Sequence, residues 1–454
     1  MTIQSSRTIR GWALSAIALV GALSLALIAP GLVHAAAPQV SNVTATSADP
    51  GSIAFRARVA TDGDIDSVVL NWKNKNPDGD VSGSIRVEAS GRTADVTTTL
   101  QTNTNDRYLP VGSQLTYSWS VTEKSGATTA SPEQQMLFMD GRYQWQTKQL
   151  GTVTIYWYAD AKNADDVLKA TADSIASNEA LLKVKLPYPV RVLLWKNSAE
   201  GKAAQRQRAA TFDQQVITGG TRVSADLLHV YDALGEGLVD VARHEAAHIV
   251  TKVAGDGKVA TMPSWLDEGT AVYAQIDPGR GYQGDLRTAI QGNRLLRLRN
   301  MAAASNNPND VNLFYGQSWA VVKFMVDTYG KDKFAAIFRS LKDEDLPIDE
   351  AMHKHIGVDQ DGLYNAYRKS VNLAVIDFPP VPKATGAAGA QATRPPLGIP
   401  TSVTSAENTS GPSGGGDSAT SAAVSPTTAI VVGVIAVVLA GALGFGAFAL
   451  SRKK

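Results

Sequence analysis

The stretch His244-Glu-Ala-Ala-His248 decides both the fold and the chemistry expected of this chain. On an α-helix, residues four positions apart lie on the same face, so both imidazoles can bind one metal ion. Residues 238–254 carry apolar side chains at helical spacing, and Gly255 follows where a helix commonly ends. Zinc binds imidazole nitrogens and keeps an open position for water in catalytic sites. The carboxylate of Glu245 is placed to take the proton of such a water.

A third ligand is expected downstream, because catalytic zinc sites usually use three protein ligands. Residues 263–275 read Pro-Ser-Trp-Leu-Asp-Glu-Gly-Thr-Ala-Val-Tyr-Ala-Gln, which predicts a second helix with Pro263 near its first turn. Glu268 lies in this helix and is the candidate ligand, while a solvated helix carboxylate is the alternative. Trp265 and Leu266 are expected to pack in the core.

His-Glu-x-x-His followed by Trp-Leu-x-Glu-Gly-x-Ala resembles the gluzincin metallopeptidases, which include thermolysin and the aminopeptidase N group. The similarity is greatest to the bacterial peptidase MA-like proteins. The resemblance implies that His244, His248 and Glu268 bind one Zn²⁺ per chain and that Glu245 is the general base. Thermolysin-like enzymes carry an aspartate four residues after the glutamate ligand, where this chain has Val272. A partner that orients a histidine ligand must therefore come from elsewhere, and Asp267 is nearest in sequence.

A further similarity lies in residues 313–330, where a tyrosine stands at the start of a predicted helix. In the aminopeptidase N group, a tyrosine near this place hydrogen-bonds the oxyanion of the tetrahedral intermediate, and Tyr315 is the matching residue. A phenol aimed at developing negative charge fits electrostatic stabilisation of the transition state. The alternative is an aromatic side chain packed at the start of a helix.

The other histidines are expected to have no role at the site. His34 lies in the N-terminal apolar segment, and His229 lies in a strand-like run where a structural role is expected. His353 and His355 stand in a polar stretch without a helical pattern, which favours a solvated surface over a metal tract.

Both ends of the chain predict export and a membrane anchor. Arg7 and Arg10 precede an apolar run and small residues at 35–37, which is typical of a signal peptide over residues 1–36, although an uncleaved anchor is also compatible. Residues 429–450 form an apolar run long enough to span a bilayer. The basic tail, residues 451–454, then belongs on the cytoplasmic side, with the body of the protein outside a bacterial cell membrane.

Composition excludes several classes of function. The chain has no cysteine, so neither disulfides nor a cysteine nucleophile nor cysteine ligands are possible. Its 43 basic and 42 acidic residues give a net charge of +1, which provides no bias toward nucleic acid. Neither a phosphate-binding loop nor a basic, aromatic nucleic-acid surface is evident.

The chain divides into two folded parts by its patterns. Residues 38–140 alternate polar and apolar side chains in short runs, which predicts an all-β sandwich of immunoglobulin or fibronectin type III kind. The clearest runs are residues 52–60, 67–72, 83–88 and 115–121. Such a module can bind a partner, space domains or support a neighbour.

Residues 141–376 predict an α+β domain, as the gluzincin resemblance implies. Strands are expected at 152–158, 190–195 and 225–231, with a helix at 163–182, and everything after the motif helix is expected to be helical. The hairpin-like residues 215–227 are the candidate sheet edge for an extended substrate. Residues 377–428 are rich in Pro, Gly, Ser and Thr and predict a linker without a core.

These observations favour a membrane-anchored, extracytoplasmic zinc metallopeptidase that hydrolyses peptide bonds, with an endopeptidase favoured weakly over an aminopeptidase. One alternative is a non-catalytic, zinc-bearing surface protein whose sandwich domain binds a partner. Another is a metallohydrolase that acts on a non-peptide amide, such as a cell-wall component. The preference for peptides follows from the family resemblance alone.

Overall fold

The structure is a computed structural model. It describes residues 38–206, 219–232, 237–258, 260–303 and 310–379. The expected signal peptide, transmembrane helix and cytoplasmic tail, and almost all of the linker, lie outside these residues. Among the residues described, no helix combines the length and the apolar character needed to cross a bilayer.

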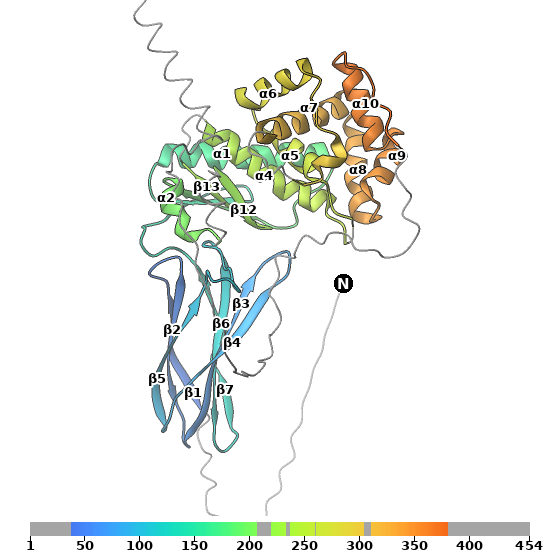
Figure 1. Ribbon diagram of the computed structural model, residues 1–454. Coiled ribbons are helices and arrows are strands. Elements are labelled where there is room, and N and C mark those ends of the chain that lie inside the picture. Colours follow the sequence, from blue (N-terminus) through green and yellow to red (C-terminus); the bar gives the residue numbers. More distant parts are fainter. Residues whose placement is uncertain (1–37, 207–218, 233–236, 259, 304–309, 380–454) are drawn as a thin grey trace, which may run out of the picture.

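The N-terminal part consists of two antiparallel sheets (Figure 1). One sheet has the order β1 (Gln39–Thr46), β2 (Ser52–Ala60), β5 (Thr93–Gln101). The other has the order β4 (Val81–Val87), β3 (Ile65–Lys75), β6 (Gln114–Glu123), β7 (Thr128–Ala130), and β8 (Gln134–Leu137) also pairs with β6.

Alternation along the strands explains why these sheets pack face to face. On β2, Phe55 and Val59 are fully buried while Arg58, between them in the alternation, is exposed. Phe55 meets Tyr117 of the opposite sheet edge-on, with ring centroids 5.0 Å apart. The β-rich N-terminal part that the sequence predicts is therefore present, as a sandwich with one core.

The second part contains a mixed sheet of five strands. Its order is β12 (Gly220–Ser224), β13 (Leu227–Tyr231), β11 (Val190–Trp195), β10 (Val153–Trp157), β9 (Gln146–Leu150). The inner strands β10, β11 and β13 run parallel, and the two outer strands are antiparallel to their neighbours. Helix α1 (Ala161–Leu182) follows β10 and leads back toward β11, as crossover connections of parallel strands do.

Helices cover one face of this sheet and continue beyond it (Figure 1). α1 and α4 (Leu238–Gly255) pack on the sheet, where Val167, Ala246 and Val250 share a core with Leu228 and Val230. The remaining helices are α2 (Ser198–Gly201), α5 (Ser264–Tyr273), α6 (Arg280–Gln291), α7 (Val311–Tyr329), α8 (Lys331–Asp343), α9 (Ile348–Ile356) and α10 (Gln360–Ser370), with short 3₁₀ turns η1 (Lys202–Ala204) and η3 (Leu298–Met301). The predicted α+β arrangement is therefore confirmed.

The sandwich packs on the opposite face of the same sheet. Leu193, Trp195 and Leu227 of the sheet belong to the core of the sandwich. The buried ring of His229 lies with Nε2 2.8 Å from the Val111 carbonyl oxygen of the sandwich. The two parts thus share one apolar core rather than meeting through a polar linker.

Candidate metal centre

Helix α4 presents its two histidines together because its other face is apolar. Ala242, Ala246 and Ile249 are fully buried toward the sheet, which turns His244 and His248 away from it. The imidazole centroids lie 4.8 Å apart, and the two Nε2 atoms are 3.1 Å apart. The pair therefore offers two nitrogens to one point in space.

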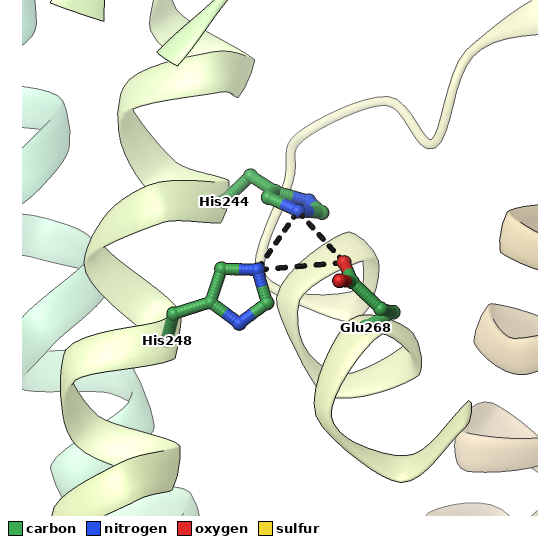
Figure 2. A group of neighbouring side chains, drawn as sticks. All are labelled: His244, His248 and Glu268. Atoms are coloured by element: carbon green, nitrogen blue, oxygen red, sulfur yellow. Dashed lines mark hydrogen bonds and ion pairs between the residues drawn. The ribbon is translucent and has the colours of Figure 1, made fainter. Parts of the chain in front are cut away.

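Helix α5 brings Glu268 to the same point, and Figure 2 shows the three side chains converging. Glu268 Oε2 lies 3.2 Å from His244 Nε2 and 3.4 Å from His248 Nε2. Trp265 and Leu266, both fully buried, anchor the helix, as expected from the sequence. Within the described ranges, these three side chains form the group of histidine and carboxylate atoms close enough to hold a metal ion.

The separations of the three donor atoms fit a tetrahedral zinc ion. Bonds of about 2.0–2.1 Å around a tetrahedral ion place neighbouring ligands about 3.3–3.4 Å apart. The observed separations are 3.1, 3.2 and 3.4 Å. Glu268 Oε2 is buried, and among the described residues no donor reaches it with hydrogen-bond geometry. A divalent cation would give this carboxylate oxygen the partner that its burial requires.

The electrostatics of the group also suit a cation. Burial alone raises the pKa of Glu268, but the neighbouring imidazoles outweigh it and lower that pKa to about 2. Burial works against the charged form of His248, yet Asp267 and Glu268 hold its pKa well above the usual 6.5. The carboxylates thus create a strongly negative environment, which favours the positively charged form of His248 and equally suits a bound cation.

Each histidine has a partner on its other ring nitrogen. His248 Nδ1 lies 3.0 Å from Asp267 Oδ1, the neighbour that the sequence indicated in place of Val272. Asp267 also accepts a hydrogen bond from Thr251 Oγ1 at 2.6 Å and pairs with Lys252 at 3.2 Å. Such partners fix the orientation of a ligating imidazole and strengthen it as a donor.

Two further residues at the centre were not predicted from the sequence. Gln275, just beyond α5, places its amide 3.2 Å from His244 Nδ1. Tyr282 of α6 lies stacked on Tyr315, with ring centroids 5.3 Å apart. Neither residue belongs to a recognisable motif, and both reach the centre only because the helices beyond α4 pack around it.

Glu245 lies between the metal-binding group and the edge strand β12. A Cβ atom at Gly220 of β12 would stand 2.8 Å from Glu245 Cγ, so glycine permits this close approach. Burial raises the pKa of Glu245, while the backbone N–H of Arg222 donates a hydrogen bond to its carboxylate. A carboxylate with a raised pKa, beside the ligands, has the properties of a general base.

Tyr315 lies on α7 against the first histidine. Its ring centroid is 6.2 Å from that of His244. Burial, followed by the charge of Glu268, raises its pKa well above 10, so the phenol stays protonated and can donate a hydrogen bond. The structure therefore places Tyr315 beside the metal-binding group, one turn inside its helix rather than at the helix start.

The remaining histidines lie away from this centre. His229 is fully buried on β13, in keeping with a structural role. The expectation of a non-helical stretch around His353 and His355 is wrong, since both lie on α9. His353 is exposed, whereas His355 is half-buried with Nε2 2.8 Å from Ser340 Oγ. His34 lies outside the described residues.

The chain is similar to several proteins of known structure. An M1 zinc metallopeptidase from Deinococcus radiodurans is 13% identical over 77% of this chain and 95% of its own, with a TM-score of 0.31. Aminopeptidase A of Legionella pneumophila is 14% identical over 73% and 49%, with a TM-score of 0.32. The sporulation control protein Spo0M of Bacillus subtilis is 15% identical over 30% and 55%, with a TM-score of 0.18. This chain thus spans about half the length of the latter two proteins.

No curated protein matches the chain. The three structural similarities are distant in both identity and shape, so the assignment depends on the family match. Residues 170–373, which include every residue of the metal-binding group and Tyr315, match the family model of the peptidase MA superfamily. The resemblance found in the two zinc-ligand motifs is thereby confirmed, and residues 170–373 of this chain belong to the peptidase MA superfamily.

Proposed function

We propose that this protein is a zinc-dependent peptidase that hydrolyses peptide bonds with Glu245 as its general base. The observation that carries the proposal is the convergence of His244, His248 and Glu268 at mutual separations of 3.1 to 3.4 Å, with Glu245 beside them. The side chains of the three ligands are 13%, 13% and 20% exposed, so the centre remains open to a small reactant. A purely structural metal site needs neither this opening nor a buried carboxylate base.

Each residue has a distinct task in the proposed reaction. His244, His248 and Glu268 would hold one zinc ion, which when bound would polarise the substrate carbonyl and lower the pKa of water. Glu245 accepts the proton of the attacking water and then delivers it to the departing amine. Tyr315 donates a hydrogen bond from its phenolic hydroxyl to the oxygen on which negative charge develops.

The substrate is proposed to bind as an extended strand along β12. This strand pairs only with β13 among the described residues, and Glu245 approaches it at Gly220. Strand addition recognises the peptide backbone and places the scissile bond beside the base. This mode of binding suits an endopeptidase that accepts varied side chains, and it disfavours a non-peptide amide as substrate.

Metal analysis and hydrolysis assays on Glu245→Gln and His248→Ala test this function. The parent chain is expected to hold about one zinc ion and to cleave members of a quenched fluorescent peptide library. Glu245→Gln should keep zinc and lower kcat by at least about 100-fold. His248→Ala should lose zinc. A Glu245→Gln variant with parental activity would refute the assigned base.

We further propose that the peptidase stands outside the cytoplasmic membrane, exported by residues 1–36 and anchored by residues 429–450. The support is the sequence pattern of these segments, with the basic tail at 451–454. Protease added to intact, wall-stripped cells should release the body of the protein. Complete protection, combined with its recovery in the soluble fraction, would rule out this placement.

A further inference from the structure

Three aromatic rings from three helices lie in series at the metal centre. His244 is on α4, Tyr315 on α7 and Tyr282 on α6. The rings of Tyr315 and Tyr282 are nearly parallel, with centroids 5.3 Å apart and an interplanar angle of 16°. Tyr315 is tilted by 59° against His244, with centroids 6.2 Å apart. Tyr315 is thus held between a metal ligand and a second tyrosine.

The two helices can bring these rings together because the residue after Tyr315 is glycine. A Cβ atom at Gly316 would stand 2.4 Å from the carbonyl oxygen of Tyr282. Only a residue without a side chain lets α6 approach α7 to this distance. The contact lies at the residues that carry the stacked rings, so the separation of the two helices sets the position of the phenols.

The same arrangement recurs where α7 meets the helix of the glutamate ligand. A Cβ atom at Gly269, the residue after Glu268, would stand 2.4 Å from the carbonyl oxygen of Ser318. The backbone of α5 therefore lies against that of α7, and the backbone of α7 lies against that of α6. Each contact adjoins a residue of the centre. A shift of α6 would change where Tyr315 lies relative to Glu268.

We propose that Tyr282 is a positioning residue, whose ring fixes the phenol of Tyr315 in the direction that the proposed oxyanion contact requires. This role rests on the proposed peptidase function for its catalytic consequence, but the position of Tyr315 can be measured without any substrate. Stacking restricts the ring of Tyr315 to one orientation, and the hydroxyl of Tyr282 is not needed for it.

Spectroscopy on the full zinc-loaded chain tests positioning directly. With 3-fluorotyrosine incorporated at position 315, the parent is expected to give one narrow ¹⁹F resonance that shifts when zinc binds. Tyr282→Leu should broaden or split that resonance, whereas Tyr282→Phe should preserve it. Phe324→Leu is the matched control, because Phe324 lies on the same helix and packs on Tyr329 and Tyr367 instead. An unchanged resonance in Tyr282→Leu would overturn the proposal.

Kinetics then distinguish positioning from simple packing. Tyr282→Leu should lower kcat by about 3- to 10-fold, with KM, zinc content and melting temperature close to those of Phe324→Leu. Gly316→Ala, which forces α6 from α7, should show the same loss. In a Tyr315→Phe background, Tyr282→Leu should have no further effect, since the hydroxyl that it positions is gone. An additive loss, or a change in KM alone, would contradict the proposal.

The two hypotheses fail in different ways. If zinc binds but the parent cleaves no peptide, the peptidase function is refuted while the ¹⁹F experiment still decides the role of Tyr282. If the parent cleaves peptides and the resonance of position 315 is indifferent to Tyr282→Leu, the function stands and the positioning role is refuted.

Discussion

The two histidines of the centre have unequal partners. His248 faces the carboxylate of Asp267, which Thr251 and Lys252 hold in place, whereas His244 faces the neutral amide of Gln275. A carboxylate acceptor increases the electron density of an imidazole more than an amide does. When His244 binds metal through Nε2, its Nδ1 carries hydrogen, and a half-turn of the Gln275 amide presents oxygen to it.

Asp267→Asn should therefore weaken zinc binding by about 10- to 100-fold, because His248 loses its charged partner while its position is nearly kept. Competition with a chromogenic chelator at neutral pH measures the change. Asp277→Asn is a suitable control, since Asp277 caps the exposed loop before α6 and contacts no ligand. Equal zinc affinity in Asp267→Asn and the parent would show that Asp267 does not support the metal.

At the scale of residues, the motifs predicted the members of the centre but not all of their neighbours. The helical spacing of His244 and His248 is a local rule, and the segment around Glu268 is recognisable beside it. Gln275 and Tyr282 follow no spacing rule, because their positions depend on how α5 and α6 pack against other helices. Asp267 could be indicated only by elimination, after Val272 was seen to lack a carboxylate.

At the scale of elements, the contact between α4 and β12 joins the base to the strand proposed to bind substrate. α4 lies over the edge strand at Gly220, where added atoms would collide with Glu245 and Val241. Glycine at this position thus lets the Glu245 side chain lie close to the strand. A strand with a side chain there would hold the helix, or its glutamate, farther away.

Gly220→Ala should lower peptide hydrolysis by about tenfold or more, because small displacements of catalytic groups have large effects on rate. Zinc content should not change, since an added Cβ atom at Gly220 meets Glu245 and Val241 and none of the three ligands. Gly284→Ala is the matched control, because nothing lies within 4 Å of a Cβ atom at Gly284 on α6. Similar kinetics for the two variants would show that the close contact at β12 has no bearing on catalysis.

The sequence predicted elements well where a pattern of burial exists. The run at residues 52–60 became β2, and the helix expected at 163–182 begins two residues earlier as α1. Strand β9 was missed because all of its side chains are exposed, so Gln146–Leu150 shows no alternation. α9 was missed because it is short and rich in charged residues. Only Ala351, Met352 and Ile356 are buried, which is too few to give a recognisable helical pattern.

At the scale of the whole molecule, the central sheet is enclosed by helices on one face and the sandwich on the other. His229 lies at the second of these boundaries, where burial lowers its pKa from 6.5 to about 4. The folded protein therefore keeps this histidine neutral at pH values where the unfolded chain binds a proton. Its contribution to stability is present above about pH 6.5 and is lost as the pH falls toward 4.

Acidification should consequently destabilise the parent more than His229→Gln. Between pH 7 and pH 4 the difference should grow by about 3 kcal/mol, taking about 1.4 kcal/mol for each unit of the shift. Urea unfolding of both chains in the presence of a metal chelator isolates this contribution from that of the zinc site. A pH-independent difference between the two chains would exclude His229 as its source.

The shared core also determines the order in which the two parts of the chain can finish folding. Leu109 and Val111 of the sandwich are buried in the same cluster as Leu193 and Trp195, which follow about 80 residues later. An N-terminal part that emerges first begins to fold first. The sandwich side chains that contact the sheet, Leu109 and Val111 among them, therefore stay exposed until β11 and β13 have been synthesised. The sandwich then provides the apolar surface on which β11 and β13 pack, and until they arrive this exposed surface is where aggregation can begin.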